Sequence, residues 1–228
     1  MPYDLLTYFE KRVSGLQKEK NGNAPFITIS RQTGCNGNEL AFQLIKVLRR
    51  KNLKWKYINK EVLEESARKL KLDESKIAYV FDTKEKSHVD EILSALSNRY
   101  YKSDRIVRKT ITEVLRHDAQ EGNIIIVGRA GVATTQDLPG GLHIRLTAPY
   151  EWRLNALKRR KAFENMDVAT FIREHDSRKR KLIEDFSGKK ISEIQFDLHF
   201  NCETFSKPQI VEMVVKAMEL KKMIRVSN

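Results

Sequence analysis

The sequence predicts an α/β domain built on a parallel sheet. Short apolar runs such as PFITIS and IIIVGR lack the polar alternation of a half-exposed strand, which is typical of strands covered on both faces. Amphipathic helical segments separate successive apolar runs, as in a parallel sheet with helices on both faces. A polar, glycine-containing turn, RQTGCNGN, directly follows the first run. These three observations predict the fold class.

The first half of the chain is predicted to contain two strands and several helices. Apolar residues recur at helical spacing over residues 4–18, which predicts an amphipathic helix. A buried strand is predicted over 26–30, a helix over about 38–50 and a short strand over 55–58. From 60 to 118 the apolar spacing stays helical, so we predict a helical insertion between two strands of the sheet.

The second half is predicted to contain three strands and three helices. The run IIIVGR is the strongest strand signal in the chain, and the runs LHIRLT and FDLHFN follow it. Asp167 is a predicted helix cap, and Ser206 with Gln209 forms a predicted capping box. The predicted elements are strands 124–129, 142–147 and 196–201, and helices from Pro149 to about 162, from Asp167 to about 186 and after Ser206.

Length and composition favour one folded domain. A chain of 228 residues suffices for one sizeable core. We therefore divide it into an N-terminal helix, 1–22, and one domain, 23–228, that carries the insertion. Hydrophobic residues make up 40% and charged residues 32%, which argues against wholesale disorder.

The targeting and cysteine signals favour a cytoplasmic protein. No stretch approaches the roughly 20 apolar residues that span a bilayer, so no membrane partner is expected. The N-terminus has no apolar run of signal-peptide length. Cys35 and Cys202 form neither a metal-binding spacing nor a disulfide framework.

The turn from Ser30 to Asn38 is the predicted phosphate-binding site. A strand, a glycine turn and a helix together point backbone N–H groups into one concavity, and the helix dipole favours an anion there. The turn lacks the lysine and hydroxyl of the pattern G-x-x-x-x-G-K-[ST]. A purely steric role for its glycines is the alternative. Cys35 within the turn is either a reactive thiol at a helix N-terminus or a small side chain that fits the space.

Five segments resemble the cytidylate kinase-like family of P-loop nucleoside monophosphate kinases. They occur in the family's order from about residue 25 to 205. ITISRQTGCNGNELA resembles its variant P-loop, SRxxGSGGxxIA, and IIIVGRAG resembles its strand with a Gly-Arg pair. The other three are LHIRLTAPYEWRLNALKRR, HDSRKRKLIEDFSGKK and FDLHFNCETF.

The resemblance implies a three-layer α/β/α P-loop NTPase fold of about five strands, with the insertion binding a monophosphate and a basic lid over about 150–180. It implies transfer of the ATP γ-phosphoryl group to CMP or dCMP with Mg²⁺. The phosphate-binding residues would be Arg31, Gly34, Cys35, Asn36, Gly37, Asn38 and Glu39. The catalytic residues would be Arg129, Asp176, Lys179 and Arg180, and the lid arginines Arg153, Arg159, Arg160 and Arg178. No metal ligand is assigned.

The chain departs from the family pattern at several positions. Gly37 stands where the P-loop lysine would be, and Glu39 stands at the Ser/Thr metal position. Asn36 replaces a glycine, and Asn59 replaces an acidic residue. The aspartate that flanks Gly-Arg in ordinary cytidylate kinases is absent. These departures bear more on catalysis than on nucleotide binding.

Basic residues concentrate where the lid is expected. The net charge is +13, and residues 153–181 contain ten Lys/Arg and four Asp/Glu. A solvated helix face is the alternative reading of such a run. Along the helix after Asp167, however, Lys179 falls on the apolar line, so it needs an anion nearby or must extend to the surface. Asp176, three residues earlier, is a candidate partner.

Two arginines adjoin the predicted sheet edge. Arg129 ends a buried strand, at the carboxyl edge where ligands bind in open α/β folds. Its guanidinium suits bidentate phosphate contacts, although a salt bridge to a helix is the alternative. Arg31, beside the turn, is a candidate substitute for the missing lysine. Tyr100 and Tyr101 are either base-stacking or core residues.

The sequence leaves three functions open. A nucleoside monophosphate kinase comes first, with nucleotides as its partners. A nucleotide-binding regulator that lost the chemistry is the alternative. A nucleic-acid-binding protein ranks last, because no recognition motif accompanies the basic charge. The apolar stripe of the N-terminal helix covers either the core or a partner subunit, which leaves a homodimer open.

Overall fold

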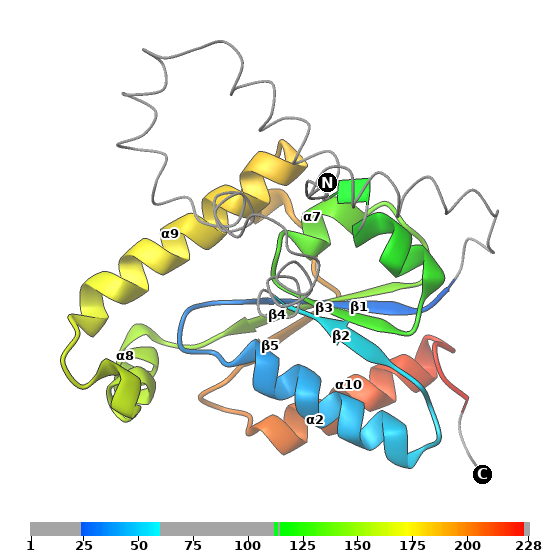
Figure 1. The fold of residues 1–228 in the computed structure, drawn as a ribbon, viewed down its shortest axis with the longest axis horizontal. Helices are drawn as coiled ribbons and strands as arrows, with labels where there is room; N and C mark the ends of the chain where they lie inside the picture. Colours follow the sequence, from blue (N-terminus) through cyan, green and yellow to red (C-terminus); the bar gives the residue numbers. More distant parts are fainter. Residues whose placement is uncertain (1–23, 60–111, 114, 226–228) are drawn as a thin grey trace, which may run out of the picture.

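In a computed structural model the chain folds around a parallel five-stranded sheet (Figure 1). The structure describes residues 24–59, 112–113 and 115–225. The strands are β1 (Phe26–Arg31), β2 (Lys56–Ile58), β3 (Ile124–Val127), β4 (Gly141–Thr147) and β5 (Leu198–Asn201), in the order β2-β3-β1-β4-β5. Every neighbouring pair is parallel. This confirms the predicted α/β class and the sheet of about five strands.

Helices cover both faces of the sheet. The helices are α2 (Gly37–Arg50), α7 (Gly131–Thr135), α8 (Tyr150–Lys158), α9 (Val168–Ser187) and α10 (Lys207–Leu220), with short 3₁₀ turns at Lys161–Phe163 and Ile191–Glu193. Helices α2 and α10 lie on one face, and α7 lies on the other (Figure 1). Residues 112–113 and 115–121 are also helical. No helix in these described ranges is long and apolar enough to cross a membrane.

The central strands β1 and β3 have long apolar runs because both of their faces are buried. Ile27 and Ile29 of β1 pack in the cluster formed with α2 and α10. Phe26, on the opposite face of the same strand, packs with Ile124 and Ile126 of β3. Successive side chains of a strand point to opposite faces, so a strand buried on both sides needs an unbroken apolar run. The missing polar alternation in the sequence has this origin.

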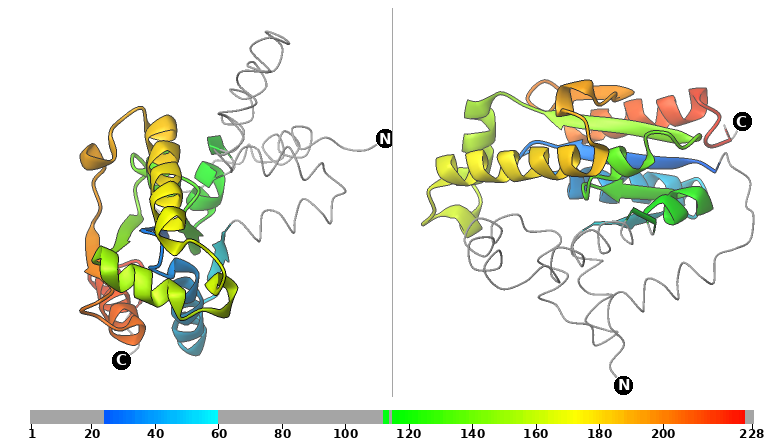
Figure 2. Two further views of the ribbon diagram at one scale, coloured as in Figure 1. Left: turned by 90° about the vertical axis from the view of Figure 1, so that its left-hand side faces the viewer. Right: turned by 90° about the horizontal axis from the view of Figure 1, so that it is seen from above.

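Helices α8 and α9 lie together beyond the carboxyl ends of the strands, and Figure 2 shows both from two further sides. Asp167 caps α9 as predicted, accepting hydrogen bonds from the N–H groups of Ala169 and Thr170 at 3.1 Å each. The capping box of Ser206 and Gln209 is also present. The carboxyl edge of the sheet therefore faces a helix whose start the sequence specifies.

Several predicted boundaries were wrong. The strand predicted to 129 ends at Val127, because Gly128, Arg129 and Ala130 all have positive φ and leave the extended region. The helix predicted to about 162 ends at Lys158. The strand predicted from 196 begins at Leu198, and α7 was missed altogether because it is only five residues long. The predicted helix over 4–18, Tyr100, Tyr101 and most of the predicted insertion over 60–118 lie outside the described residues.

Candidate functional site

The turn between β1 and α2 has the backbone geometry of an anion-binding loop. Gly34 has a φ of +98°, and the Cys35 N–H donates to the carbonyl of Gln32 at 3.1 Å. Asn36 caps α2, because its side-chain oxygen accepts from the Glu39 N–H at 3.2 Å. Within the described part of the chain, no hydrogen bond uses the N–H of Gly34, Asn36 or Gly37. These groups are available to an anion at the helix N-terminus.

The buried Arg153 side chain and the Asp176 carboxylate both form hydrogen bonds with the turn at Thr33. The Thr33 N–H donates to Asp176 Oδ1 of α9 at 2.7 Å. Arg153 of α8 donates from Nη1 to Asp176 Oδ2 at 2.6 Å and to the Thr33 carbonyl at 3.2 Å, and from Nε to the Ala148 carbonyl at 3.1 Å. We call Thr33, Arg153 and Asp176 the turn clamp. It ties α8, α9 and the turn into one unit.

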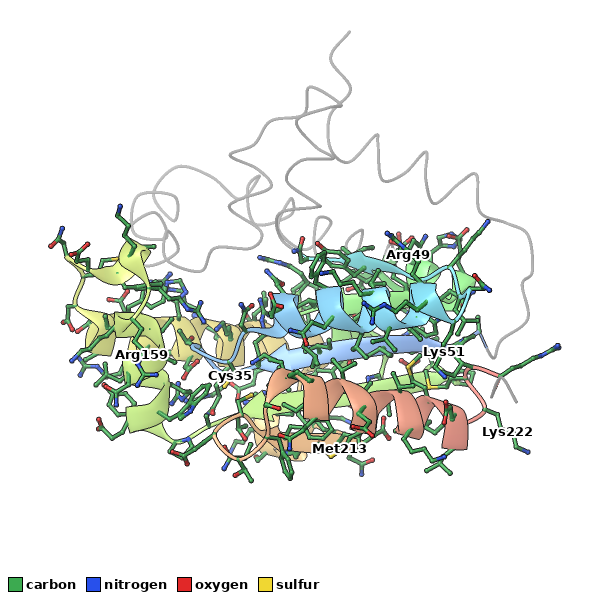
Figure 3. All side chains as sticks on the ribbon, turned by 90° about the horizontal axis from the view of Figure 1, so that it is seen from below. Cys35, Arg49, Lys51, Arg159, Met213 and Lys222 are labelled. Atoms are coloured by element: carbon green, nitrogen blue, oxygen red, sulfur yellow. The ribbon has the colours of Figure 1, made fainter. Side chains whose placement is uncertain are left out.

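The structure places Arg153 against the turn, and its role in the expected lid stays a prediction. The sequence placed it among the lid arginines, but it is only 6% exposed and lies under the turn. Arg159 and Arg160 are exposed and take no part in the clamp; Arg159, which directly follows α8, is labelled in Figure 3. Arg178 pairs with Glu174 on the same helix at 2.7 Å. Of the four arginines expected in the lid, Arg153 alone forms a hydrogen bond with the turn among the residues that the structure describes.

Lys179 lies on the inward face of α9, as its position on the apolar line predicts. Its ammonium donates to Thr33 Oγ1 at 2.7 Å. Burial, and then the nearby Arg31 guanidinium, lower the pKa of Lys179 from 10.5 to about 8, against the opposing effect of Asp176. The expected pairing with Asp176 is not the main contact, because that carboxylate is bound to Arg153 and Thr33. Lys179 is therefore a cation held against the turn, and the described residues include no carboxylate that forms an ion pair with it.

A small, strongly basic pocket lies between this turn, the strand ends and α9. The volume of this pocket is about 90 Å³. Among its lining residues are five cations and a single carboxylate, Asp176. The cations are Arg31, Arg129, Arg145, Lys179 and Arg180. Four of these cations are half-buried and Arg180 is exposed. Because cations outnumber carboxylates among the described lining residues, the pocket suits a multiply charged anion.

Arg31 enters the pocket because two glycines leave it room. A Cβ on Gly37 would lie 3.2 Å from Arg31 Cδ, and a Cβ on Gly128 would overlap the Arg31 guanidinium. Gly37 is the residue that stands where a P-loop lysine is expected. Gly37 therefore supplies no lysine, but its missing side chain leaves space for Arg31 at the end of β1.

Arg145 is a pocket residue that the sequence reasoning missed. It lies in β4 and its guanidinium packs 5.3 Å from the centre of the Phe196 ring. Burial lowers its pKa, and the neighbouring Asp176 carboxylate partly opposes that effect. The signal was available in LHIRLT, where a charged residue interrupts an apolar strand. His143 in the same strand packs instead, and its Nδ1 lies 2.8 Å from Thr28 Oγ1.

The other predicted phosphate-binding residues surround the turn without lining the pocket. Asn38 and Glu39 lie in the first turn of α2, where Glu39 accepts a hydrogen bond from Gln43 at 2.8 Å. Cys35 is buried at 2% exposure. The structure therefore brings Arg31, Arg129, Lys179, Arg180 and Asp176 together in one place and leaves Glu39 outside it.

Gly34→Ala is expected to destabilise the protein by about 2–4 kcal/mol. The positive φ alone costs an alanine roughly 1–2 kcal/mol, and its methyl group would also lie 2.9 Å from Arg153 Cβ. Gly188→Ala is the matched control, because Gly188 has a φ of +67° and nothing lies within 4 Å of its Cβ position. Urea unfolding of both variants measures the difference. An equal loss of unfolding free energy in both variants would show that the turn shifts to accommodate the methyl group.

Comparisons with known proteins agree with this architecture. A crystal structure of an uncharacterized protein from Eubacterium ventriosum is 14% identical with a TM-score of 0.59, over 86% of this chain and 98% of that one. Shikimate kinase from Acinetobacter baumannii, in complex with shikimate, is 11% identical with a TM-score of 0.49, over 93% and 99%. At 14% identity, the likeness to the first of these structures concerns the fold alone. A search of curated proteins finds no significant match. The model of the cytidylate kinase-like family matches residues 26–204.

Proposed function

This chain belongs to the cytidylate kinase-like family, and from that membership we propose that it is a nucleoside monophosphate kinase that transfers the ATP γ-phosphoryl group to CMP or dCMP. The observation that carries the proposal is the basic pocket beside the phosphate-type turn. Five cations face one carboxylate there, and that carboxylate is already bound to Arg153. The described lining of the pocket is thus predominantly basic, which suits phosphate oxygens.

Phosphoryl transfer requires little covalent chemistry from the protein. Phosphoryl transfer is accelerated mainly by positioning the two substrates and by neutralising the charge on the transferred group. In the proposed arrangement the N–H groups of the turn, with Arg31 and Lys179, bind the ATP phosphates. Arg129, which follows β3, and Arg145, which lies in β4, bind the acceptor phosphate.

The turn and the pocket offer groups that suit the phosphates of ATP, but they offer few ligands for Mg²⁺. The turn offers unused N–H groups, and the pocket offers guanidinium and ammonium groups for a polyphosphate. The single carboxylate of the pocket lining, Asp176, already accepts from Thr33 and Arg153. Mg²⁺ commonly binds through substrate phosphates and waters with few protein ligands. In our proposal the nucleotide brings the ion, which neutralises phosphate charge, and the protein contributes the cations.

A coupled assay of ADP release tests the kinase proposal. The full chain is assayed with ATP and Mg²⁺ against CMP, dCMP, UMP, AMP and GMP in turn. We expect turnover that depends on the acceptor and is greatest with CMP or dCMP. Arg129→Met should lower kcat/KM by at least about tenfold, as the loss of one charge-assisted phosphate contact predicts. Folded wild-type protein that turns over none of the five acceptors would defeat the proposal.

A nucleotide-binding regulator is the second candidate, favoured by two observations at the turn. Gly37 replaces the P-loop lysine, and Glu39 is hydrogen-bonded to Gln43. A site with these features can bind nucleotide without the groups that promote transfer. Calorimetry that shows ATP or CMP binding by protein without turnover would favour this reading over the kinase.

A further inference from the structure

Lys179 is the one lysine among the described residues that line the basic pocket. Its side-chain nitrogen lies 2.7 Å from Thr33 Oγ1, so the turn fixes the end of this long side chain. The other four cations of the described lining are arginines, which stay protonated in proteins and offer no lone pair. A lysine amine that loses its proton, in contrast, is a nucleophile. The pocket therefore combines groups that suit phosphate with an amine that can react.

The groups around Lys179 favour its neutral amine. The Asp176 carboxylate opposes this effect, but it also accepts hydrogen bonds from Arg153 and Thr33. Cations predominate among the charged and titratable groups that surround Lys179, and neighbouring cations are one way in which proteins activate a lysine. These groups are Asp176 and Arg180 on α9, Arg31 at the end of β1, Cys35 in the turn, Arg129 after β3, Arg145 in β4 and Arg153 in α8. Burial and these cations agree with the pKa of about 8 for Lys179.

We propose that Lys179 is an acylation site for small acyl phosphates, which the pocket binds through their phosphate group. The neutral amine attacks the carbonyl carbon, a C–N bond forms, and the C–O bond to the phosphate breaks. Inorganic phosphate leaves with the electron pair of that bond, and it takes up the proton that the nitrogen releases. The products are an amide on Lys179 and inorganic phosphate, so the step needs no oxidant or reductant.

Proximity gives Lys179 its advantage over other lysines. Guanidinium groups suit phosphate oxygens, so Arg31, Arg129 and Arg145 hold the acyl phosphate in the pocket that Lys179 also lines. The reaction then takes place within one complex, which raises its rate. A pocket of about 90 Å³ favours a short acyl group over a long chain. The bound phosphate also favours the ammonium form of Lys179, so we expect acylation to accelerate from about pH 7 to about pH 9.

Acylation removes one of the five cations of the pocket, because the amide carries no charge. In the proposed function Lys179 binds the ATP phosphates together with Arg31 and the turn. The effect of acylation on nucleotide binding therefore rests on the proposed function. Acylation itself requires only that the pocket bind a phosphate group.

Peptide mass spectrometry of the full chain treated with acetyl phosphate tests the chemistry. We expect Lys179 to be acetylated at least about tenfold faster than Lys181, an exposed lysine two positions further along. Inorganic phosphate should slow the acetylation of Lys179 and leave that of Lys181 unchanged, whereas sodium chloride at the same ionic strength should slow Lys179 less. Acetic anhydride, an acyl donor without a phosphate group, should show less preference for Lys179.

Arg145→Met tests the part played by the pocket. It should slow the acetylation of Lys179 by acetyl phosphate at least about tenfold, as the loss of a charge-assisted phosphate contact predicts, and leave Lys181 unchanged. The proposal would be overturned if Lys179 reacts no faster than Lys181, if phosphate does not protect it, or if acetic anhydride shows the same preference. These three measurements use the wild-type chain, so they decide the proposal even where the variant does not fold.

The ATP affinity of the acetylated protein tests the consequence separately. The control is protein acetylated in the presence of inorganic phosphate, which is then removed, because its exposed lysines are modified while Lys179 is protected. Protein acetylated at Lys179 should bind ATP at least about tenfold more weakly than this control, a difference of about 1.4 kcal/mol. Equal affinities would refute the coupling to nucleotide binding. If the untreated protein binds no ATP, the proposed function fails while the mass measurement still decides the acylation.

Discussion

Asp176→Ala is expected to lower the free energy of unfolding by about 3 kcal/mol, because it removes the carboxylate of the turn clamp. Arg153 would be left with its side chain only 8% exposed and no partner for its charge in the clamp. Breaking a buried ion pair by removing one member typically costs about 3–5 kcal/mol, and the 19% exposure of the Asp176 side chain favours the lower end. The Thr33 N–H would also lose its acceptor. Equilibrium unfolding in urea measures the loss.

Glu174→Gln is the matched control for that experiment. It breaks the ion pair with Arg178 on the same helix, but the Glu174 side chain is 42% exposed, so we expect a change within about 0.5 kcal/mol. Arg153→Met combined with Asp176→Ala removes both charges and should recover part of the loss. If Asp176→Ala alone costs no more than the control, the clamp does not hold the turn.

Lys179→Met is expected to stabilise the protein while it weakens nucleotide binding. The ordinary lysine pKa of 10.5 falls to about 8 in the folded state, so keeping this ammonium charged at pH 7 destabilises the fold. Removing the charge should raise the free energy of unfolding by roughly 1–3 kcal/mol at pH 7. The loss of a charged phosphate contact should weaken ATP binding by about 10- to 100-fold. Opposite changes in stability and binding are the signature of a binding residue.

The pH dependence of unfolding identifies the group responsible. Between about pH 8 and 10.5 the unfolded chain binds a proton at Lys179 that the folded chain has lost, so Lys179 makes stability rise with pH across this window. Below pH 8 its destabilising effect is fully present. Lys179→Met should lack this contribution.

Lys181→Met, at an exposed neighbouring position, carries the same change of net charge. It should keep the Lys179 contribution to the pH profile and keep nucleotide binding close to that of the wild type. If Lys179→Met is less stable than the wild type at pH 7, the hydrogen bond to Thr33 outweighs the cost of burying the charge.

The sequence by itself determined the strands, the glycine turn between β1 and α2, and the inward position of Lys179. These features depend on residues close in the chain. The run Ile124–Val127 is apolar on both faces, which predicts a buried strand. Lys179 faces inward because it lies on the same side of α9 as the buried Ile172 and Ile183. The capping residue Asp167 likewise acts on its nearest neighbours, Ala169 and Thr170.

Only the tertiary structure decided how the site is assembled. Arg153 is indistinguishable in sequence from the exposed Arg159 and Arg160, and it became part of the clamp because α8 places it under the turn. Cys35 and Cys202 likewise enter one buried apolar cluster, although 167 positions separate them in the sequence. Such pairings depend on the packing of segments more than 100 residues apart, and local periodicity carries no signal for them. Nearby residues in the chain therefore specify where the proposed anion site lies, and the fold selects the side chains that surround it.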